Sequence, residues 1–396
     1  MTRTERWLLP EGIEELLPSE ARRLEALRRR LLDLYATWGY AQVMPPFIEY
    51  LESLRVGSGS DLDIETFKLT DQLTGRLMGV RADMTPQVAR IEAHRLRQDA
   101  PTRLCYLGTV LRTRPDGPGG SRSPLQVGAE LYGHAGIESD AEVVALMLET
   151  LEACGIHGAH LDLGHVGIFR RLAALAGLDE EGEAELFEIL QRKARAELEG
   201  ALEGLPETHA TPLLALVDLN GGDEVVEAAR QRLAGISDEI DAALDALAGI
   251  AEALRRERPD LVLHFDLAEL RGYRYHTGVV FAALLPGHGE TVARGGRYDD
   301  LGGSFGRARP ATGFSADLRT LARLGGTQAT AATESGIFAP ADSDPALCQT
   351  IRALRAAGER VVRALPGQNG GAAEMGCDRE LVREGGNWEV RAVHGA

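Results

Sequence analysis

The chain has 396 residues, of which 44% are hydrophobic and 26% charged, and this balance is ordinary for a soluble globular protein of two or three domains. Its formal net charge is -17, whereas a protein that holds a polyphosphate backbone normally carries a basic stripe, so nucleic acid is not an expected partner. Four cysteines without a C-x-x-C pair, and no apolar signal or membrane segment, predict a cytoplasmic protein without metal, disulfides or membrane contact.

The first predicted element is an amphipathic helix that leads into a strand. A helix is predicted because the apolar positions are spaced by three and four residues. Ser19 can cap this helix and Gly39 can end it. The segment Tyr40–Glu49 then predicts a strand that Pro45 and Pro46 close. The apolar positions of the helix are Leu24, Leu27, Leu31, Leu34 and Trp38.

A hairpin and a strand-to-helix turn follow. Phe67–Leu69 and Arg76–Val80 flank a turn-rich segment and predict two paired strands. The next segment, VRADMTPQVAR, predicts a helix with Thr85 as its N-cap and Pro86 at its first position. Asp83 and Thr85 therefore lie at a strand end, which places a carboxylate beside a hydroxyl. The alternative that Asp83 only caps the helix stays open.

A second hairpin spans Arg103–Gly133. The apolar run Leu104–Leu111 and the alternating run Leu125–Tyr132 stand on either side of a loop rich in Pro and Gly. The alternation places Gln126 and Glu130 on one face of the second strand, two pleats apart. An acid and an amide on a sheet face indicate a polar site, and the alternative is a sheet with one solvated side.

The character of the sequence changes between residues 165 and 257, where it is rich in Ala, Leu and Glu. Amphipathic helices are expected within 180–205 and 238–256, the second with Ile240, Leu244, Leu247 and Leu254 on its apolar face. Their acidic sides are either solvated or form a partner surface. Strands resume over 260–270 and 279–284, and a last strand leads into a helix that ends near Leu324.

The end of the chain predicts a small separate domain. Residues 325–335 form a Gly-, Ala- and Thr-rich linker. Residues 336–396 follow, with a strand at Ile337–Ala339, a helix at Ala346–Ala357 and short valine-containing runs.

Three of these stretches resemble class II aminoacyl-tRNA synthetases, and most closely the histidyl enzyme. They are the hairpin YLGTVLR…LQVGAELYG, the segment RGYRYHTGVVF, which is similar to the histidine-specific segment, and the last motif ARGGRYDDLGGSFGRARPATGFSADL. The resemblance implies an α+β fold, an antiparallel sheet flanked by helices over residues 1–324. It also implies a helical insertion at 165–257 and a small C-terminal α/β tail domain. The helix and strand over 18–49 resemble the segment that forms the dimer interface in that family.

The resemblance implies a site for free histidine. Residues that match the family's amino-acid pocket are Asp83, Thr85, Gln126, Glu130, Arg271, Tyr275 and His276. A carboxylate for the ammonium, another for an imidazole N–H and an arginine for the carboxylate are what histidine requires. Two positions depart from the family: Asp83 replaces a glutamate, and His276 replaces a tyrosine. A purely structural role for His276 stays open.

The nucleotide side of the resembled site is altered. Its positions are Arg112, which is kept, and Arg114, Asp317, Arg319 and Thr320, which replace an acid, a glycine, an acid and an arginine. Arginines and a carboxylate-held metal supply the field that stabilises the phosphoryl transition state, and loss of one such donor alone costs about 10²–10³ in rate. We therefore expect no adenylation, no catalytic residues, no cofactor and no metal.

With the amino-acid residues largely kept and the nucleotide residues replaced, the sequence resembles the family of synthetase-like regulatory subunits of ATP phosphoribosyltransferase. That resemblance implies a non-catalytic subunit that pairs with itself, joins a short-form catalytic subunit at the first step of histidine biosynthesis and responds to L-histidine as an effector. A divergent histidyl-tRNA synthetase or another adenylate-forming enzyme is the first alternative. An RNA-binding module is the second, and the acidic balance opposes it.

Overall fold

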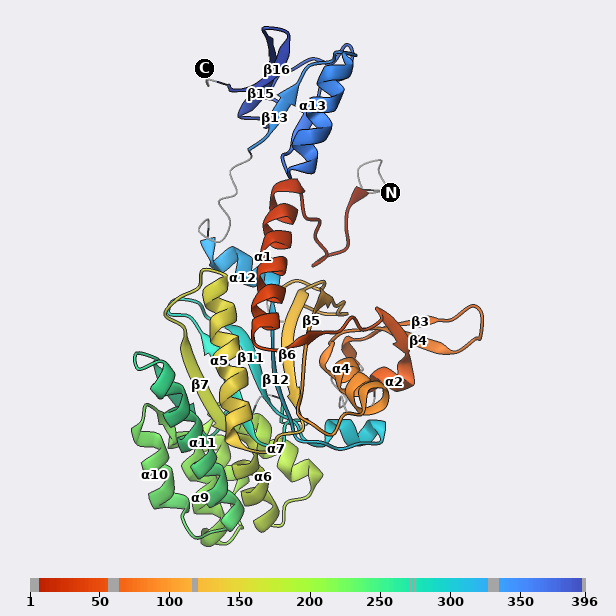
Figure 1. The fold of residues 1–396 in the computed structure, drawn as a ribbon. Coiled ribbons are helices and arrows are strands. Elements are labelled where there is room, and N and C mark those ends of the chain that lie inside the picture. The colour runs from red at the N-terminus through yellow and green to blue at the C-terminus, as the bar shows by residue number, and fades with distance from the viewer. Residues whose placement is uncertain are drawn as a thin grey trace. The chain divides into compact units, whose positions relative to one another are not determined.

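The structure is a computed structural model, and it describes residues 7–55, 64–115, 120–270, 272–273, 275–326 and 335–393. Within the chain, Met1–Ala329 and Thr330–Ala396 form two compact units. In Figure 1 the first unit runs from red through cyan and the second is blue. Residues 327–334, which make up most of the predicted linker, lie outside the described part of the chain.

A central sheet organises the first unit. In the described residues its strands are, in spatial order, β1 (Ala41–Gln42), β5 (Thr102–Thr109), β6 (Leu125–Tyr132), β12 (Ala311–Asp317), β11 (Thr291–Arg297), β10 (Val279–Leu284), β7 (His160–His165), β9 (Leu263–Asp266) and β8 (Asn220–Gly221). Neighbours are antiparallel except for the pairs β1–β5 and β7–β9. The expected α+β fold with a largely antiparallel sheet is confirmed.

Helices cover one face of this sheet. They are α1 (Pro18–Thr37), α5 (Ile137–Ala153) and α11 (Asp238–Glu257), and Figure 1 shows α1 and α5 lying along the strands. The alternate residues Val127, Ala129 and Leu131 of β6 point into the core that these helices form. The apolar positions predicted for 238–256 are all buried in this core.

A smaller apolar core lies on the opposite face of the sheet. Short helices supply it: α4 (Thr85–Ile91), the π-helical turn Glu92–Leu96 and the 3-10 turn Leu301–Phe305. Met84 and Val88 pack there against Tyr106 of β5 and Tyr298. Gln126 and Glu130 are 4% and 1% exposed on this face, so the alternative of a solvated sheet side is wrong.

Two expectations near the N-terminus are corrected. Helix α1 begins at Pro18, not after a Ser19 cap, because proline lacks the N–H that the first turn leaves unpaired and its φ suits the helix. The predicted strand 40–49 is two strands in different sheets, β1 and β2 (Ile48–Tyr50), because Pro45 and Pro46 interrupt it. Strand β2 pairs with β4 (Leu77–Val80), which also pairs with β3 (Phe67–Thr70), so the predicted hairpin is confirmed.

Helices fill the chain between β7 and β9. They are α6 (Val166–Leu175), α7 (Glu180–Gln191), α8 (Arg195–Ala201), α9 (Glu207–Asp218) and α10 (Glu224–Leu233), followed by α11. The helices predicted within 180–205 and 238–256 are present. The strand predicted over 260–270 is shorter, and only Leu263–Asp266 is extended.

The remaining elements are short. Helix α2 is Leu51–Arg55, and α12 is Leu318–Leu324, after which Gly326 adopts a φ of +64°. The second unit has a sheet ordered β14 (Val361–Arg363), β13 (Ile337–Ala339), β15 (Arg379–Glu384) and β16 (Asn387–Ala392), with α13 (Pro345–Ala356) packed on it. None of the helices in the described ranges has the length and apolar character that crossing a membrane requires.

Candidate functional site

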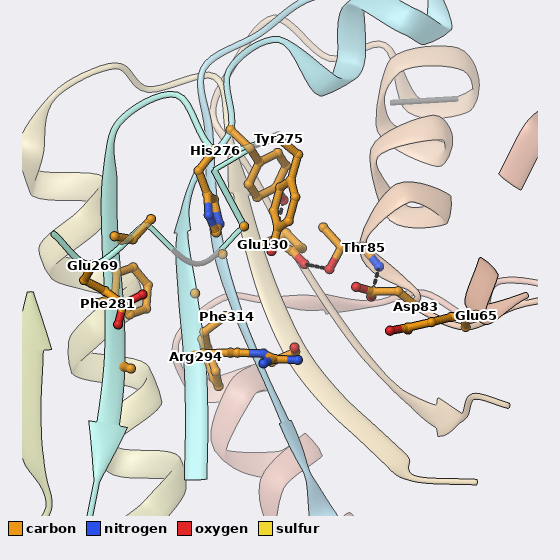
Figure 2. A pocket seen from close by; sticks show the side chains of 18 of the residues that line it. Glu65, Asp83, Thr85, Glu130, Glu269, Tyr275, His276, Phe281, Arg294 and Phe314 are labelled. Carbon is orange, nitrogen blue, oxygen red and sulfur yellow. Dashed lines mark hydrogen bonds between the residues drawn. The ribbon is translucent and has the colours of Figure 1, made fainter. Parts of the chain in front are cut away.

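A cavity of about 310 Å³ opens on the sheet face that carries Glu130. Strands β10, β11 and β12, the start of α4 and the segment between β9 and β10 form its walls. Figure 2 shows Asp83 and Thr85 on one side, Tyr275 and His276 above, and Arg294 reaching towards the side of Asp83. Its size is at the lower end of the range for small-molecule sites, about 300–1,000 Å³.

Asp83 stands at the edge of the cavity and is held from behind. Its Oδ1 accepts hydrogen bonds from the backbone N–H of Thr85 at 2.9 Å and from Nε2 of Gln126 at 2.8 Å. Oε1 of Gln126 accepts in turn from the backbone N–H of Met84 at 2.9 Å. The hydrogen bonds from Thr85 and Gln126 both go to Oδ1 of Asp83, which leaves Oδ2 of Asp83 for a ligand. Gln126 is not among the lining residues, so its geometry is that of a support for Asp83.

Thr85 occupies a different helix position from the one predicted. Met84 is the N-cap of α4 and Thr85 is the first helical residue, because Asp83 already accepts the bond from the Thr85 N–H. The Thr85 hydroxyl is therefore directed to the site, where it donates to Oε1 of Glu130 at 2.9 Å. Asp83 does contribute to the helix start, and its carboxylate also lines the cavity.

Glu130 is the most buried charged group of the site, with 1% of its surface exposed. Its Oε1 accepts from Thr85 and from the Tyr106 hydroxyl at 2.9 Å, and its Oε2 accepts from the Tyr298 hydroxyl. Burial raises its pKa from 4.5 to about 8, because removal from water disfavours the carboxylate more than these three donors stabilise it. At neutral pH Glu130 is therefore largely protonated.

Glycines on neighbouring strands make room for this network. Gly313 of β12 lies opposite Glu130, and a Cβ at that position would overlap the Glu130 carboxyl group. Gly128 lies opposite Tyr106, and a Cβ there would meet the Tyr106 hydroxyl. Sequence analysis missed Tyr106 and Tyr298. The alternation of β5 carried a signal for Tyr106, which faces Gly128 between Gln126 and Glu130.

The segment between β9 and β10 contributes, in the described part of the chain, two of the three residues that the sequence predicted there. Tyr275 and His276 both line the cavity, and their ring centroids lie 4.1 Å apart. His276 is 5% exposed, and its backbone N–H donates to the Gly272 carbonyl at 3.0 Å. Gly272 has φ of +69°, which a glycine adopts without strain. Arg271 lies outside the described residues.

Four further charged residues line the cavity, and the sequence did not single out three of them. Glu65 and Glu269 add carboxylates, and Arg294 adds a guanidinium. Arg112, which the sequence placed on the nucleotide side, forms an ion pair with Glu65 at 3.9 Å and donates to the Ala82 carbonyl at 3.4 Å. The cavity thus presents carboxyl groups and arginines together, an arrangement that suits a zwitterion.

Two of the positions that the sequence placed on the nucleotide side, Asp317 and Thr320, bind each other. Asp317 caps α12 by accepting from the backbone N–H groups of Arg319 and Thr320, and the Thr320 hydroxyl donates to it at 2.9 Å. Asp317 also accepts from the Leu125 N–H at 2.9 Å and so ties β6 to α12. Arg319 approaches Glu14 only at 4.0 Å, and Arg114 is exposed. These contacts give Asp317 a structural role and engage Thr320.

Across the ranges that the structure describes, no group of three or more His, Cys, Asp or Glu side chains is arranged to hold a metal ion. The cavity itself is lined by hydrogen-bonding and charged side chains. It can accept hydrogen bonds from an ammonium at Asp83, exchange a proton at Glu130 and donate hydrogen bonds to an anion from Arg112 and Arg294.

Comparison with known proteins gives two family matches and several relatives. Residues 12–321 match the family model "Histidyl-tRNA synthetase", and residues 334–391 match "ATP phosphoribosyltransferase subunit HisZ C-terminal domain". Proteins named ATP phosphoribosyltransferase regulatory subunit are similar over almost the whole chain. The one from Thioalkalivibrio sulfidiphilus is 63% identical over 97% of this chain and 98% of its own, and the one from Pseudomonas syringae pv. syringae is 56% identical over 98% and 99%.

Solved structures are also similar over most of the chain. A crystal structure described as an ATP phosphoribosyltransferase regulatory subunit/histidyl-tRNA synthetase from Bacillus halodurans has a TM-score of 0.81 and 28% identity, covering 93% of this chain and 95% of that one. Histidyl-tRNA synthetase from Nostoc has a TM-score of 0.77 at 23% identity, covering 95% and 91%, which shows the shared fold alone.

Proposed function

Because the chain belongs to the family of ATP phosphoribosyltransferase regulatory subunits, we propose that its cavity binds free histidine and that occupancy of the cavity controls a separate catalytic subunit. The partner in this proposal is a short-form phosphoribosyltransferase, which carries out the first step of histidine biosynthesis in the cytoplasm. The names of the relatives and the family match of residues 334–391 support this partner.

The charges around the cavity support histidine as the effector. Oδ2 of Asp83 suits the ammonium group, and Arg112 and Arg294 suit the carboxylate. Glu130 suits the imidazole, because its pKa of about 8 lies close to the ordinary histidine value of about 6.5. Because these two pKa values are similar, Glu130 and the imidazole can share one proton, whichever of them carries it before histidine binds.

One observation carries the regulatory proposal, and it is the contrast between the two sides of the site. On the amino-acid side Asp83, Thr85 and Glu130 converge on the cavity. On the nucleotide side Asp317 is a carboxylate that caps α12, and it would repel a triphosphate. A pocket that binds an amino acid but cannot activate it on ATP is suited to sensing.

We also propose that the chain forms a homodimer through the segment between α1 and α2. Met44, Phe47 and Ile48 of this segment are exposed, and large exposed apolar groups are typical of protein contacts. Light scattering of the purified chain tests this, and a monomer at micromolar concentration would exclude it.

Calorimetry with L-histidine tests the effector. We expect binding to the full chain, and a loss of about 10-fold or more in Asp83→Asn, because a charge-assisted hydrogen bond contributes about 1.5–3 kcal/mol. The matched control is Asp260→Asn, which changes an exposed carboxylate in the turn before β9. Equal affinity in Asp83→Asn and Asp260→Asn would remove the pocket assignment. Imidazole-free analogues such as alanine should not bind.

A histidine-activating enzyme is the competing function, and the match of residues 12–321 to the synthetase model favours it. Histidine-dependent exchange of pyrophosphate into ATP distinguishes the two. The regulatory proposal predicts no exchange above a protein-free blank.

A further inference from the structure

The segment between β9 and β10 has one side towards the cavity and another towards the helices that follow β7. Glu269, Tyr275 and His276 line the cavity, and Figure 2 shows Tyr275 beside His276 at the top and Glu269 beside Phe281 at the left. Tyr273 lies between them in the sequence, is buried, and contacts α6 and α7 instead. A single short segment thus joins the cavity to these helices.

The Tyr273 side chain fixes the far side of this segment. Its ring packs between Phe169 of α6 and Phe187 of α7, with centroid separations of 5.4 Å and 5.5 Å. Its hydroxyl donates to Glu183 of α7. Aromatic pairs at such distances are attractive beyond their buried area. The position of Tyr273 therefore depends on how α6 and α7 are placed.

Arg170 of α6 connects the same helix to the cavity side. Its Nη2 donates to the carbonyl of Tyr273 at 2.8 Å and to the carbonyl of His276 at 3.1 Å. Its guanidinium carbon also lies 4.8 Å from the centroid of the Tyr273 ring. One nitrogen thus holds the two ends of the turn that presents Tyr275 and His276. The planar guanidinium of an arginine fixes the directions of its N–H groups for such a bridge, whereas an ammonium is a flexible point charge.

We propose that Arg170 is a positioning residue of the histidine cavity and that it makes α6 and α7 responsive to the cavity's occupant. This inference rests on the proposed function, because it assumes that the occupant is histidine. A ligand that fixes the His276 ring also fixes the His276 carbonyl, and Arg170 passes that constraint to α6. By linkage, a change in the placement of α6 and α7 alters the affinity for histidine by the same factor.

The neighbouring residue Arg171 supplies a matched control. It is on the same helix but points to the start of α11, where its Nε donates to the Ser237 hydroxyl at 3.2 Å and lies 3.5 Å from Glu239. Arg170→Leu and Arg171→Leu each remove one arginine and its polar contacts from α6. Only the first disconnects the cavity segment.

Calorimetry of the full chain with L-histidine, together with hydrogen exchange of α7 peptides with and without histidine, tests the inference. We expect about tenfold weaker binding in Arg170→Leu, partial recovery in Arg170→Lys and unchanged affinity in Arg171→Leu. Histidine should slow exchange in α7 of the unsubstituted chain and of Arg171→Leu, but not in Arg170→Leu. If Arg170 had a purely structural role, Arg170→Leu would lower the melting temperature and leave the histidine affinity unchanged.

The outcomes separate this inference from the proposed function. If the unsubstituted chain binds histidine and Arg170→Leu binds it equally well, the inference is overturned and the effector assignment stands. If the unsubstituted chain does not bind histidine, the proposed function fails and the inference fails with it.

Discussion

The Glu130→Gln substitution should change how the stability of the first unit depends on pH. Glu130 is buried, and its pKa is raised from 4.5 to about 8 in the folded protein. The folded state therefore holds a proton that the unfolded state releases between these two values. This contribution to stability is complete below about pH 4.5 and is lost as the pH rises towards 8. Glutamine keeps the shape of the protonated acid and cannot titrate.

The magnitude follows from the width of the window. Each pH unit between the two pKa values changes the free energy of unfolding by about 1.4 kcal/mol for one group. Between pH 5.5 and 7.5 the unsubstituted chain should lose about 3 kcal/mol through Glu130 alone. The other titrating groups are common to both proteins. Their contributions cancel when the pH dependence of Glu130→Gln is subtracted from that of the unsubstituted chain.

Urea unfolding followed by circular dichroism at pH 5.5 and 7.5 measures this difference. Glu185→Gln, which changes an exposed carboxyl group of α7, should retain the pH dependence of the unsubstituted chain. If Glu130→Gln lost the same stability over this range as the unsubstituted chain, Glu130 would not be the titrating group and the proton-sharing role proposed for it would be wrong.

Two further substitutions test the contacts around the site. Gly313→Ala should displace the Glu130 carboxyl group, lower the free energy of unfolding by about 1–3 kcal/mol and weaken histidine binding. Gly289→Ala, where a Cβ meets open space, should do neither. Equal histidine affinities of the two variants by calorimetry would contradict this. Asp317→Ala should cost about 0.5–2 kcal/mol in urea unfolding, because it removes the cap of α12; an unchanged midpoint would show that the cap is dispensable.

Local patterns were sufficient for the hairpins and for one side of the site. The alternation of Leu125–Tyr132 predicted that Gln126 and Glu130 share a face, because the side-chain period of a strand depends only on neighbouring residues. The bounds of β10 and of β13 agree with the predicted segments for the same reason. The resemblance to synthetases supplied the residues that meet across longer distances, such as Asp83 and Tyr275.

What the sequence could not provide depends on register between distant strands and on competition for the same hydrogen bond. Tyr298 reaches Glu130 from more than 160 residues away, and no local pattern predicts that convergence. Thr85 was expected to cap α4, but Asp83 takes that hydrogen bond and leaves the Thr85 hydroxyl for Glu130. Gln126 was expected to face the ligand; the structure shows that it donates a hydrogen bond to Asp83, and its contact with a ligand stays a prediction.

The central claim is that this chain controls a catalytic partner in response to histidine. The most direct measurement is the phosphoribosyltransferase activity of a short-form catalytic subunit from the same source, assayed alone, with this chain, and with this chain plus L-histidine. Our account predicts that activity requires the chain and falls when histidine is added, and that Asp83→Asn keeps the activity but loses the response. Activity that is indifferent to the chain would contradict the account.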